Sequence, residues 1–206
     1  MNWEGFLASI KGERIDVVGP EYAPHHIPFA EPVIFVDGGV RFRKSKEGFA
    51  VGDGDSAPDP SALNLLLPKE KDFSDLAFTL ANLPETITEV RLHGFLGGRL
   101  DHQFFNIGEA CAFLRQRKRP SRVFFDDKII AHSAGSWAFD QKGLFSLAVL
   151  EAAKVLVHGD VKYPIDPASD VLPLSSLGLS NVALGRFGIH SNKPFLILCE
   201  EKGVIG

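Results

Sequence analysis

The stretch LHGFLGGRLDHQFFN, residues 92–106, joins a strand-like pattern to a helical one through a pair of glycines. Before the glycines, EVRLHGF alternates as a strand does. After them, apolar residues recur at the spacing of one helix face, at Leu100, Phe104, Ile107, Cys111 and Leu114. A strand, a tight turn and a helix in succession are typical of α/β folds, so this stretch predicts an α/β domain.

The same texture extends to the start of the chain. Short β-branched and aromatic runs at residues 14–19, 33–39 and 48–56 predict strands, the last two ending in Asp-Gly turns. The segment 20–32 contains four prolines and predicts a loop. Ser74 stands before a helically spaced apolar run and predicts a capped helix.

After Pro120 the pattern changes to short β-rich runs separated by Gly, Asp, Asn and Pro. These runs are residues 121–127, 128–133, 135–140, 144–150, 154–160, 181–190 and 194–201. Their spacing is that of a small β-sandwich. We therefore predict an α/β N-terminal domain, residues 1–120, followed by a C-terminal all-β sandwich domain, residues 121–206.

Composition excludes several classes of protein. The chain has 206 residues, of which 45% are apolar and 23% charged, as in ordinary globular proteins. Its net charge of −4 argues against a nucleic-acid partner. Cys111 and Cys199 lack the spacing of a disulfide framework or a metal site. The sequence shows neither a signal peptide nor a membrane-spanning stretch, so we expect a cytoplasmic protein without a membrane partner.

The pentapeptide GDGDS at residues 52–56 is a candidate magnesium site. Asp53 and Asp55 are two residues apart, so an extended backbone would direct both carboxylates to one side. Gly52 and Gly54 permit close approach. Magnesium prefers oxygen ligands and commonly takes one or two protein carboxylates. The alternative is an ordinary Asp-Gly turn.

The segment KEKDFSD offers a second set of polar groups. Asp72 and Asp75 flank Ser74 at the start of the predicted helix, where carboxylates interact favourably with the helix dipole. The alternative is that these residues serve only to cap the helix. Lys71 is either a phosphate ligand or a solvated charge.

The glycine pair Gly97–Gly98 lets backbone amides approach an anion at a helix N-terminus, and Arg99 can hold phosphate oxygens. Asp101 falls in the first turn, while His102 and Asn106 share a helix face that could line a pocket. The structural alternative is a tight turn with a cap. Neither a Walker loop nor a GxGxxG motif is present.

Taken in order, these motifs resemble those of the thiamine pyrophosphokinase family. DGG at 37–39, GDGDS at 52–56, KDFSD at 71–75 and GGRLDH at 97–102 with Asn106 are similar to DGGAN, GDxDS, KDxTD and GGRxDHxxxN. Weaker likeness follows in GLFSLAVL, VHGDVKYPI and GLSN of the second domain, with Tyr163 where the family commonly has tryptophan. The resemblance covers roughly residues 33–200.

The resemblance implies transfer of the pyrophosphoryl group of ATP to the hydroxyl of thiamine, giving thiamine diphosphate and AMP. It makes Asp53, Asp55 and Asp75 the magnesium ligands. It assigns catalysis to Asp75, Arg99 and Asp101, of which Asp101 would position or deprotonate the alcohol. The nucleotide would be bound by residues of all four motifs: Asp37, Gly38, Gly39, Lys71, Asp72, Ser74, Gly97, Gly98, His102 and Asn106.

Family members are homodimers in which the sandwich of one subunit helps to close the thiamine site of the other. The resemblance therefore implies a homodimer with Ser180 and Asn181 near the substrate, and an aromatic partner for the thiamine rings. Two departures stand out: Arg41 lies near the family's asparagine, and the segment from Asp37 to Asp53 is short. The alternatives are another diphosphokinase, such as one acting on hydroxymethylpterin, or a non-catalytic thiamine- or nucleotide-binding module.

Overall fold

The structure is a computed structural model that describes residues 1–22, 29–44, 48–126, 128–166 and 170–199. The chain forms two compact units. The first comprises residues 1–113 with 123–126, and the second comprises residues 114–122 with 127–206. The chain is rich in strands, with three α-helices among the described residues.

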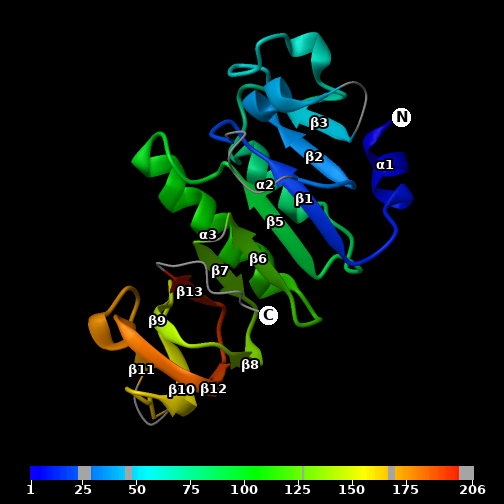
Figure 1. Cartoon of the computed structure of the whole chain (residues 1–206). Helices are drawn as coiled ribbons and strands as arrows, with labels where there is room; N and C mark the ends of the chain where they lie inside the picture. Colours follow the sequence, from blue (N-terminus) through cyan, green and yellow to red (C-terminus); the bar gives the residue numbers. More distant parts are fainter. Residues whose placement is uncertain (23–28, 45–47, 127, 167–169, 200–206) are drawn as a thin grey trace. The chain divides into compact units, whose positions relative to one another are not determined.

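The first unit is built on a parallel sheet (Figure 1). Its strands are β1 (Arg14–Val18), β2 (Val33–Val36), β3 (Phe49–Gly52), β4 (Leu65–Leu66), β5 (Glu89–His93) and β6 (Arg122–Phe125). They lie in the order β6-β5-β1-β2-β3-β4. Within this order, each neighbouring pair from β5 onward is parallel. The carboxyl ends of β1, β2, β3 and β5 therefore meet at one edge, where α/β proteins bind their ligands.

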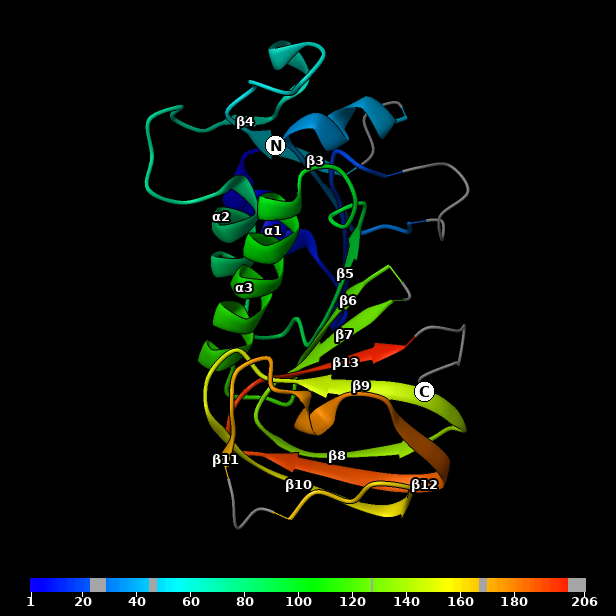
Figure 2. The same ribbon diagram turned by 90° about the vertical axis from the view of Figure 1, so that its left-hand side faces the viewer.

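Three helices pack on this sheet: α1 (Trp3–Ser9), α2 (Asp75–Ala81) and α3 (Leu100–Gln116). Figure 2 shows them on the same side of β5. The ring of Trp3 contacts both Phe49 of β3 and Phe78 of α2, which joins α1 to the sheet. The predicted cap of α2 is confirmed, because Ser74 Oγ accepts a hydrogen bond from the Ala77 N–H at 3.0 Å.

The second unit is antiparallel. Its strands are β7 (Ile129–His132), β8 (Gly135–Asp140), β9 (Gly143–Ala148), β10 (Ala153–Val161), β11 (Asp170–Val171), β12 (Asn181–Ser191) and β13 (Phe195–Cys199). They lie in the order β11-β10-β12-β9-β13-β7, and β8 also pairs with β12. Residues of six strands, β8 to β13, form one core, including Phe139, Phe145, Val155, Phe187 and Phe195.

Each β-rich run predicted after Pro120 overlaps one strand of the structure. Sequence patterns missed the short elements α1, β4 and β11 and three 3-10 helices: η1 (Asp37–Phe42), η2 (Pro60–Ala62) and η3 (Ser176–Gly178). The Asp-Gly turn predicted at Asp37 is therefore the start of η1. The middle of the predicted proline-rich loop, residues 23–28, lies outside the described residues.

The predicted apolar face of α3 is only partly correct. Cys111 and Leu114 are buried, but Leu100 and Phe104 are exposed. Helical spacing establishes which residues share a face, whereas burial depends on how far neighbouring elements extend along that face. The first turns of α3 thus present apolar side chains to solvent.

Candidate active site

Three carboxylates meet at the carboxyl edge of the parallel sheet. Asp37 follows β2, Asp53 follows β3 and Asp75 is the first residue of α2. One ligand atom from each lies within 4.8 Å of the others, which is compatible with a shared metal ion. We call these three residues the acid cluster.

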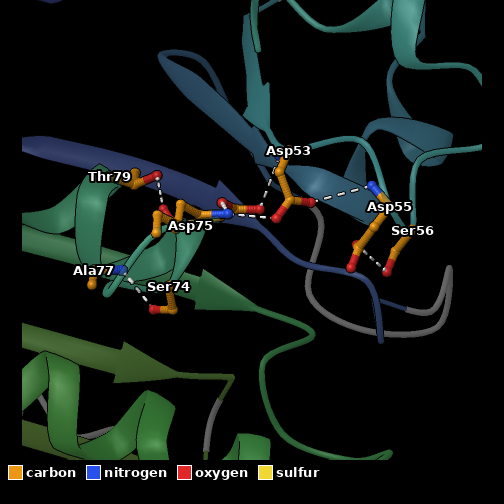
Figure 3. Close-up of polar contacts among 8 residues, drawn as sticks. Asp53, Asp55, Ser56, Ser74, Asp75, Ala77 and Thr79 are labelled. Atoms are coloured by element: carbon orange, nitrogen blue, oxygen red, sulfur yellow. Dashed lines mark hydrogen bonds and ion pairs between the residues drawn. The ribbon is translucent and has the colours of Figure 1, made fainter. Parts of the chain in front are cut away.

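Lys71 lies inside the acid cluster. Its Nζ forms ion pairs with Asp53 Oδ2 and, at 3.1 Å, with Asp75 Oδ1. Only 7% of the Lys71 side chain is exposed, against 14% for Asp53 and 12% for Asp75. In Figure 3 the carboxyl groups of Asp53 and Asp75 point toward one another. Of the two interpretations of Lys71 from sequence, the solvated charge is therefore wrong.

Burial and ion pairing act against each other on these groups. Burial alone would raise the pKa of Asp53, but the Lys71 ammonium outweighs it and lowers that pKa. Burial raises the pKa of Asp75, and Lys71 offsets this only in part. Burial also opposes the charge on Lys71, yet its two carboxylate partners raise its pKa. The ammonium is thus a firmly charged member of the cluster.

Asp37 is held in a conformation that few residues other than glycine adopt. Its φ of 45° lies in the left-handed region, and its Oδ1 is buried without a hydrogen-bond partner among the described residues. Burial, together with the negative charges of Asp55 and Asp75, raises the pKa of Asp37. A strained residue with an unsatisfied buried oxygen is typical of a site that binds a ligand.

Asp55 lies outside the acid cluster. It is exposed, its Oδ1 accepts a hydrogen bond from Ser56 Oγ at 3.0 Å, and its N–H donates to Asp53 Oδ1 at 3.2 Å. Figure 3 shows its carboxyl group near Ser56 and away from Asp75. Asp72 is exposed, and the Ser74 hydroxyl caps α2. The carboxylates that lie close together in the structure are therefore those of Asp53, Asp37 and Asp75, and Asp55 is not among them.

The predicted phosphate-type loop follows β5 at the same edge of the sheet. Gly97 and Gly98 both have positive φ, 102° and 60°, which glycine adopts without strain. A Cβ on Gly98 would lie 2.5 Å from Glu21 Oε1, so a side chain at this position would displace Glu21. Glu21 follows β1. Sequence patterns did not indicate that it lies beside Gly98, because the two residues are far apart in the chain.

Arg99 and Asp101 form an exposed bidentate pair. Arg99 Nε and Nη2 donate to the two carboxylate oxygens of Asp101 at 3.1 and 2.5 Å. This pairing lowers the pKa of Asp101 to about 2. A carboxylate with so low a pKa is a weak general base at neutral pH.

His102 and Asn106, which are predicted to share a helix face, have different surroundings in the structure. Asn106 Nδ2 donates to the carbonyl of Phe95 at 2.9 Å and so fastens α3 to the glycine-containing loop. His102 is exposed at the start of the helix. Gly38 and Gly39 are buried in η1, where a Cβ on Gly39 would lie 2.1 Å from the carbonyl oxygen of Val18. Close packing on β1 therefore accounts for Gly39.

In the second unit, the two predicted substrate residues differ in exposure. Ser180 is exposed, with a φ of 57°, and its N–H donates to Ser146 Oγ. Asn181 is buried, and its amide bonds to the backbone of Tyr163. Tyr163 is itself exposed and lies beside the Lys162 ammonium. The exposed tyrosine, rather than the buried Asn181, is thus accessible to a ligand.

The fold and the acid cluster together describe a two-unit protein, one unit α/β and one antiparallel β, with an oxygen-rich candidate cation site. Solved structures of similar fold include proteins named as thiamine pyrophosphokinases. The enzyme from Geobacillus thermodenitrificans is 23% identical with a TM-score of 0.66, covering 92% of this chain and 98% of its own. That from Bacillus subtilis is 21% identical with a TM-score of 0.65, covering 91% and 99%.

The likeness extends to a fungal protein. Thiamin pyrophosphokinase from Candida albicans is 13% identical with a TM-score of 0.66, covering 94% of this chain and 89% of its own. No protein-family model matches the sequence, and no curated protein matches it. The chain therefore has the thiamine pyrophosphokinase fold at low sequence identity. Among the described residues, none of the helices is both long and apolar enough to span a membrane.

Proposed function

We propose that this protein is a thiamine pyrophosphokinase, which transfers the pyrophosphoryl group of ATP to the hydroxyl of thiamine. The observation that carries this proposal is the acid cluster with Lys71, positioned at the carboxyl edge of the parallel sheet in a chain of this fold. We assign the catalytic part to residues 1–120 and the acceptor-binding part, as a β-sandwich, to residues 121–206.

The reaction forms a bond between the thiamine hydroxyl oxygen and the β-phosphorus of ATP. The bond from the β-phosphorus to the α,β-bridging oxygen breaks, AMP leaves, and the hydroxyl proton is released. Such a transfer depends mainly on alignment and charge neutralisation. We assign phosphate binding to Lys71, Arg99 and the amides of the glycine pair, and alignment of the alcohol to Asp101.

The acid cluster fits magnesium. Its donors are carboxylate oxygens, the ligands that this hard cation prefers, and the buried, unpartnered Oδ1 of Asp37 is an available one. We therefore assign the metal to Asp37, Asp53 and Asp75. When bound, magnesium would neutralise charge on the phosphates. The sequence-based assignment of Asp55 as a ligand stays a prediction, and its exposure suits contact with metal-bound water.

We propose Tyr163 as the aromatic partner of the thiamine rings, with Ser180 near the same substrate. Exposed leucines support the proposed homodimer, because large apolar side chains on a surface are candidates for burial at a contact. They lie on the segment before β12 and on β9 and β12: Leu144, Leu172, Leu174, Leu177, Leu179 and Leu184. The cytoplasmic location stays a prediction.

The test is to incubate the protein with ATP, Mg²⁺ and thiamine and to measure AMP and thiamine diphosphate by chromatography. We expect equal amounts of both products. If AMP forms with hydroxymethylpterin as the acceptor but not with thiamine, the result would favour a diphosphokinase that acts on hydroxymethylpterin. Binding of thiamine or ATP in calorimetry without turnover of either acceptor would favour the binding module. An Asp53→Asn variant serves as the inactive control.

A further inference from the structure

Lys71 and a divalent cation require the same oxygen atoms. The Lys71 ammonium contacts Asp53 Oδ2 and Asp75 Oδ1, and these carboxylates are two of the three in the acid cluster. All three side chains are nearly enclosed. A metal held by Asp53 and Asp75 would therefore meet a positive charge already in contact with its ligands.

The ammonium also has a structural effect. Without it, three carboxylates whose oxygens lie within 4.8 Å would repel one another in a poorly solvated place. Lys71 comes from the segment between β4 and α2, four residues before Asp75. A lysine has a flexible four-carbon stem, so its ammonium can move by several ångströms while the backbone stays in place.

We infer that Lys71 is an internal counterion that occupies the cation position of the acid cluster until a divalent metal displaces its ammonium. This inference rests on the proposed function, because it assumes that the acid cluster binds metal. The displaced ammonium then becomes available to the triphosphate that accompanies the metal. Lys71 thus links metal binding to phosphate binding, and the cluster keeps a cation throughout.

The inference predicts that removing the ammonium strengthens metal binding. Mn²⁺ is titrated by calorimetry, without nucleotide, into the wild-type protein, Lys71→Met and Lys69→Met. Lys69 is exposed and two residues away, so its variant removes the same charge outside the cluster. We expect Lys71→Met to bind Mn²⁺ about tenfold more tightly than wild type and Lys69→Met to stay within about twofold of it.

Equal or weaker binding by Lys71→Met would overturn the inference, since Lys71 would then support the metal site instead of competing for it. If Lys69→Met strengthens Mn²⁺ binding as much as Lys71→Met does, the inference is also overturned, since the effect would then come from the overall charge of the protein. If wild type binds Mn²⁺ and Lys71→Met binds it no more tightly, the inference fails but the proposed metal site stands. If none of the three proteins binds Mn²⁺, both fail.

A second measurement uses the wild-type protein alone, because Lys71→Met leaves buried carboxylates unpaired and risks misfolding. The protein is acylated briefly with an amine reagent, with and without Mg²⁺, and the extent of modification at each lysine is measured by mass spectrometry. We expect Mg²⁺ to increase modification of Lys71 several-fold, with Lys69 unchanged as the control. Unchanged or reduced modification of Lys71 would overturn the inference.

Discussion

The side-chain amide of Asn181 brackets the backbone of Tyr163. Asn181 Nδ2 donates to the Tyr163 carbonyl at 2.6 Å, and Asn181 Oδ1 accepts from the Tyr163 N–H at 3.1 Å. The same Oδ1 accepts from the Val182 N–H at 2.8 Å. Asn181 is 4% exposed, whereas Tyr163 is 52% exposed. One residue therefore fixes the position of the other without needing to touch a ligand itself.

This relationship predicts different defects for the two residues. Tyr163→Ala should raise the KM for thiamine about tenfold with little change in thermal stability, because the ring is exposed and its stacking contributes roughly 1.4 kcal/mol. Asn181→Ala should raise the same KM and also lower the free energy of unfolding by about 1–3 kcal/mol, since partly buried backbone groups lose their partners. Steady-state kinetics and urea unfolding measure these effects. Tyr163→Phe is the control, and an unchanged KM in Tyr163→Ala would refute the stacking.

The acid cluster predicts that Asp37 matters more to metal binding than Asp55. Asp37→Asn should weaken Mn²⁺ binding about tenfold or more, because it removes the charge of an oxygen ligand. Asp55→Asn removes the same charge from an exposed carboxylate outside the cluster and should have a smaller effect. Calorimetric titration of both variants compares them directly. A larger loss in Asp55→Asn would support the paired ligands expected from GDGDS.

Local patterns predicted the regular elements well. The apolar spacing and the Ser74 cap define α2 within a few residues of sequence, and alternating runs define strands such as β10. Short elements such as β4 carry too few residues for a pattern. The exposed start of α3 was missed because periodicity does not report which neighbours cover a face.

Site residues that depend on distant partners were harder to assign. Asp37 joins Asp53 and Asp75 because parallel strands end at one edge, and no local spacing records this meeting. The burial of Lys71 follows from the same convergence, so sequence could not separate an ion-paired lysine from a solvated one. The resemblance places Asn181 near the substrate, and no sequence pattern indicated its hydrogen bonds to the backbone of Tyr163, 18 residues away.

Arg99 and Asp101 are predicted to act in catalysis rather than in stability. Arg99→Ala should raise the KM for ATP and lower kcat, whereas Asp101→Asn should mainly lower kcat, by about a hundredfold. Both side chains are exposed, so the thermal midpoint should change little. Because its pKa is about 2, Asp101 stays ionised throughout pH 5–8 and should add no acid limb to kcat/KM there. Loss of stability with normal turnover would reject these roles.

The exposed leucines predict a dimer that charge can disrupt. Leu177→Asp and Leu179→Asp should lower the sedimentation coefficient toward that of a monomer, because a buried unpaired carboxylate is costly in an interface. Both side chains are exposed, so each variant should still fold. Turnover of thiamine should fall with dissociation if the partner helps to close the acceptor site. A wild-type monomer with full activity would contradict the proposed dimer.

His132 on β7 predicts a specific sensitivity to acid. Its ring stacks on Phe195, contacts Trp137 and Phe139 edge-on, and has no hydrogen-bond partner at either nitrogen among the described residues. Burial, with a smaller effect of Arg122, lowers its pKa to about 3. The unfolded chain has a value of about 6.5, so between these values the unfolded state binds the proton and the folded state does not.

The stabilisation of the fold that comes from the neutral His132 ring is complete above about pH 6.5 and is lost as the pH falls from there toward about 3. Near pH 5.5 the expected loss is about 1.4 kcal/mol relative to neutral pH. Urea unfolding at pH 7.5 and 5.5 measures this loss in the free energy of unfolding. The His132→Phe variant should lose about 1.4 kcal/mol less than wild type between these two pH values. His158→Gln, which alters an exposed histidine on β10, is the matched control and should behave as wild type. Equal acid sensitivity in wild type and His132→Phe would mean that the buried ring is protonated in the folded protein.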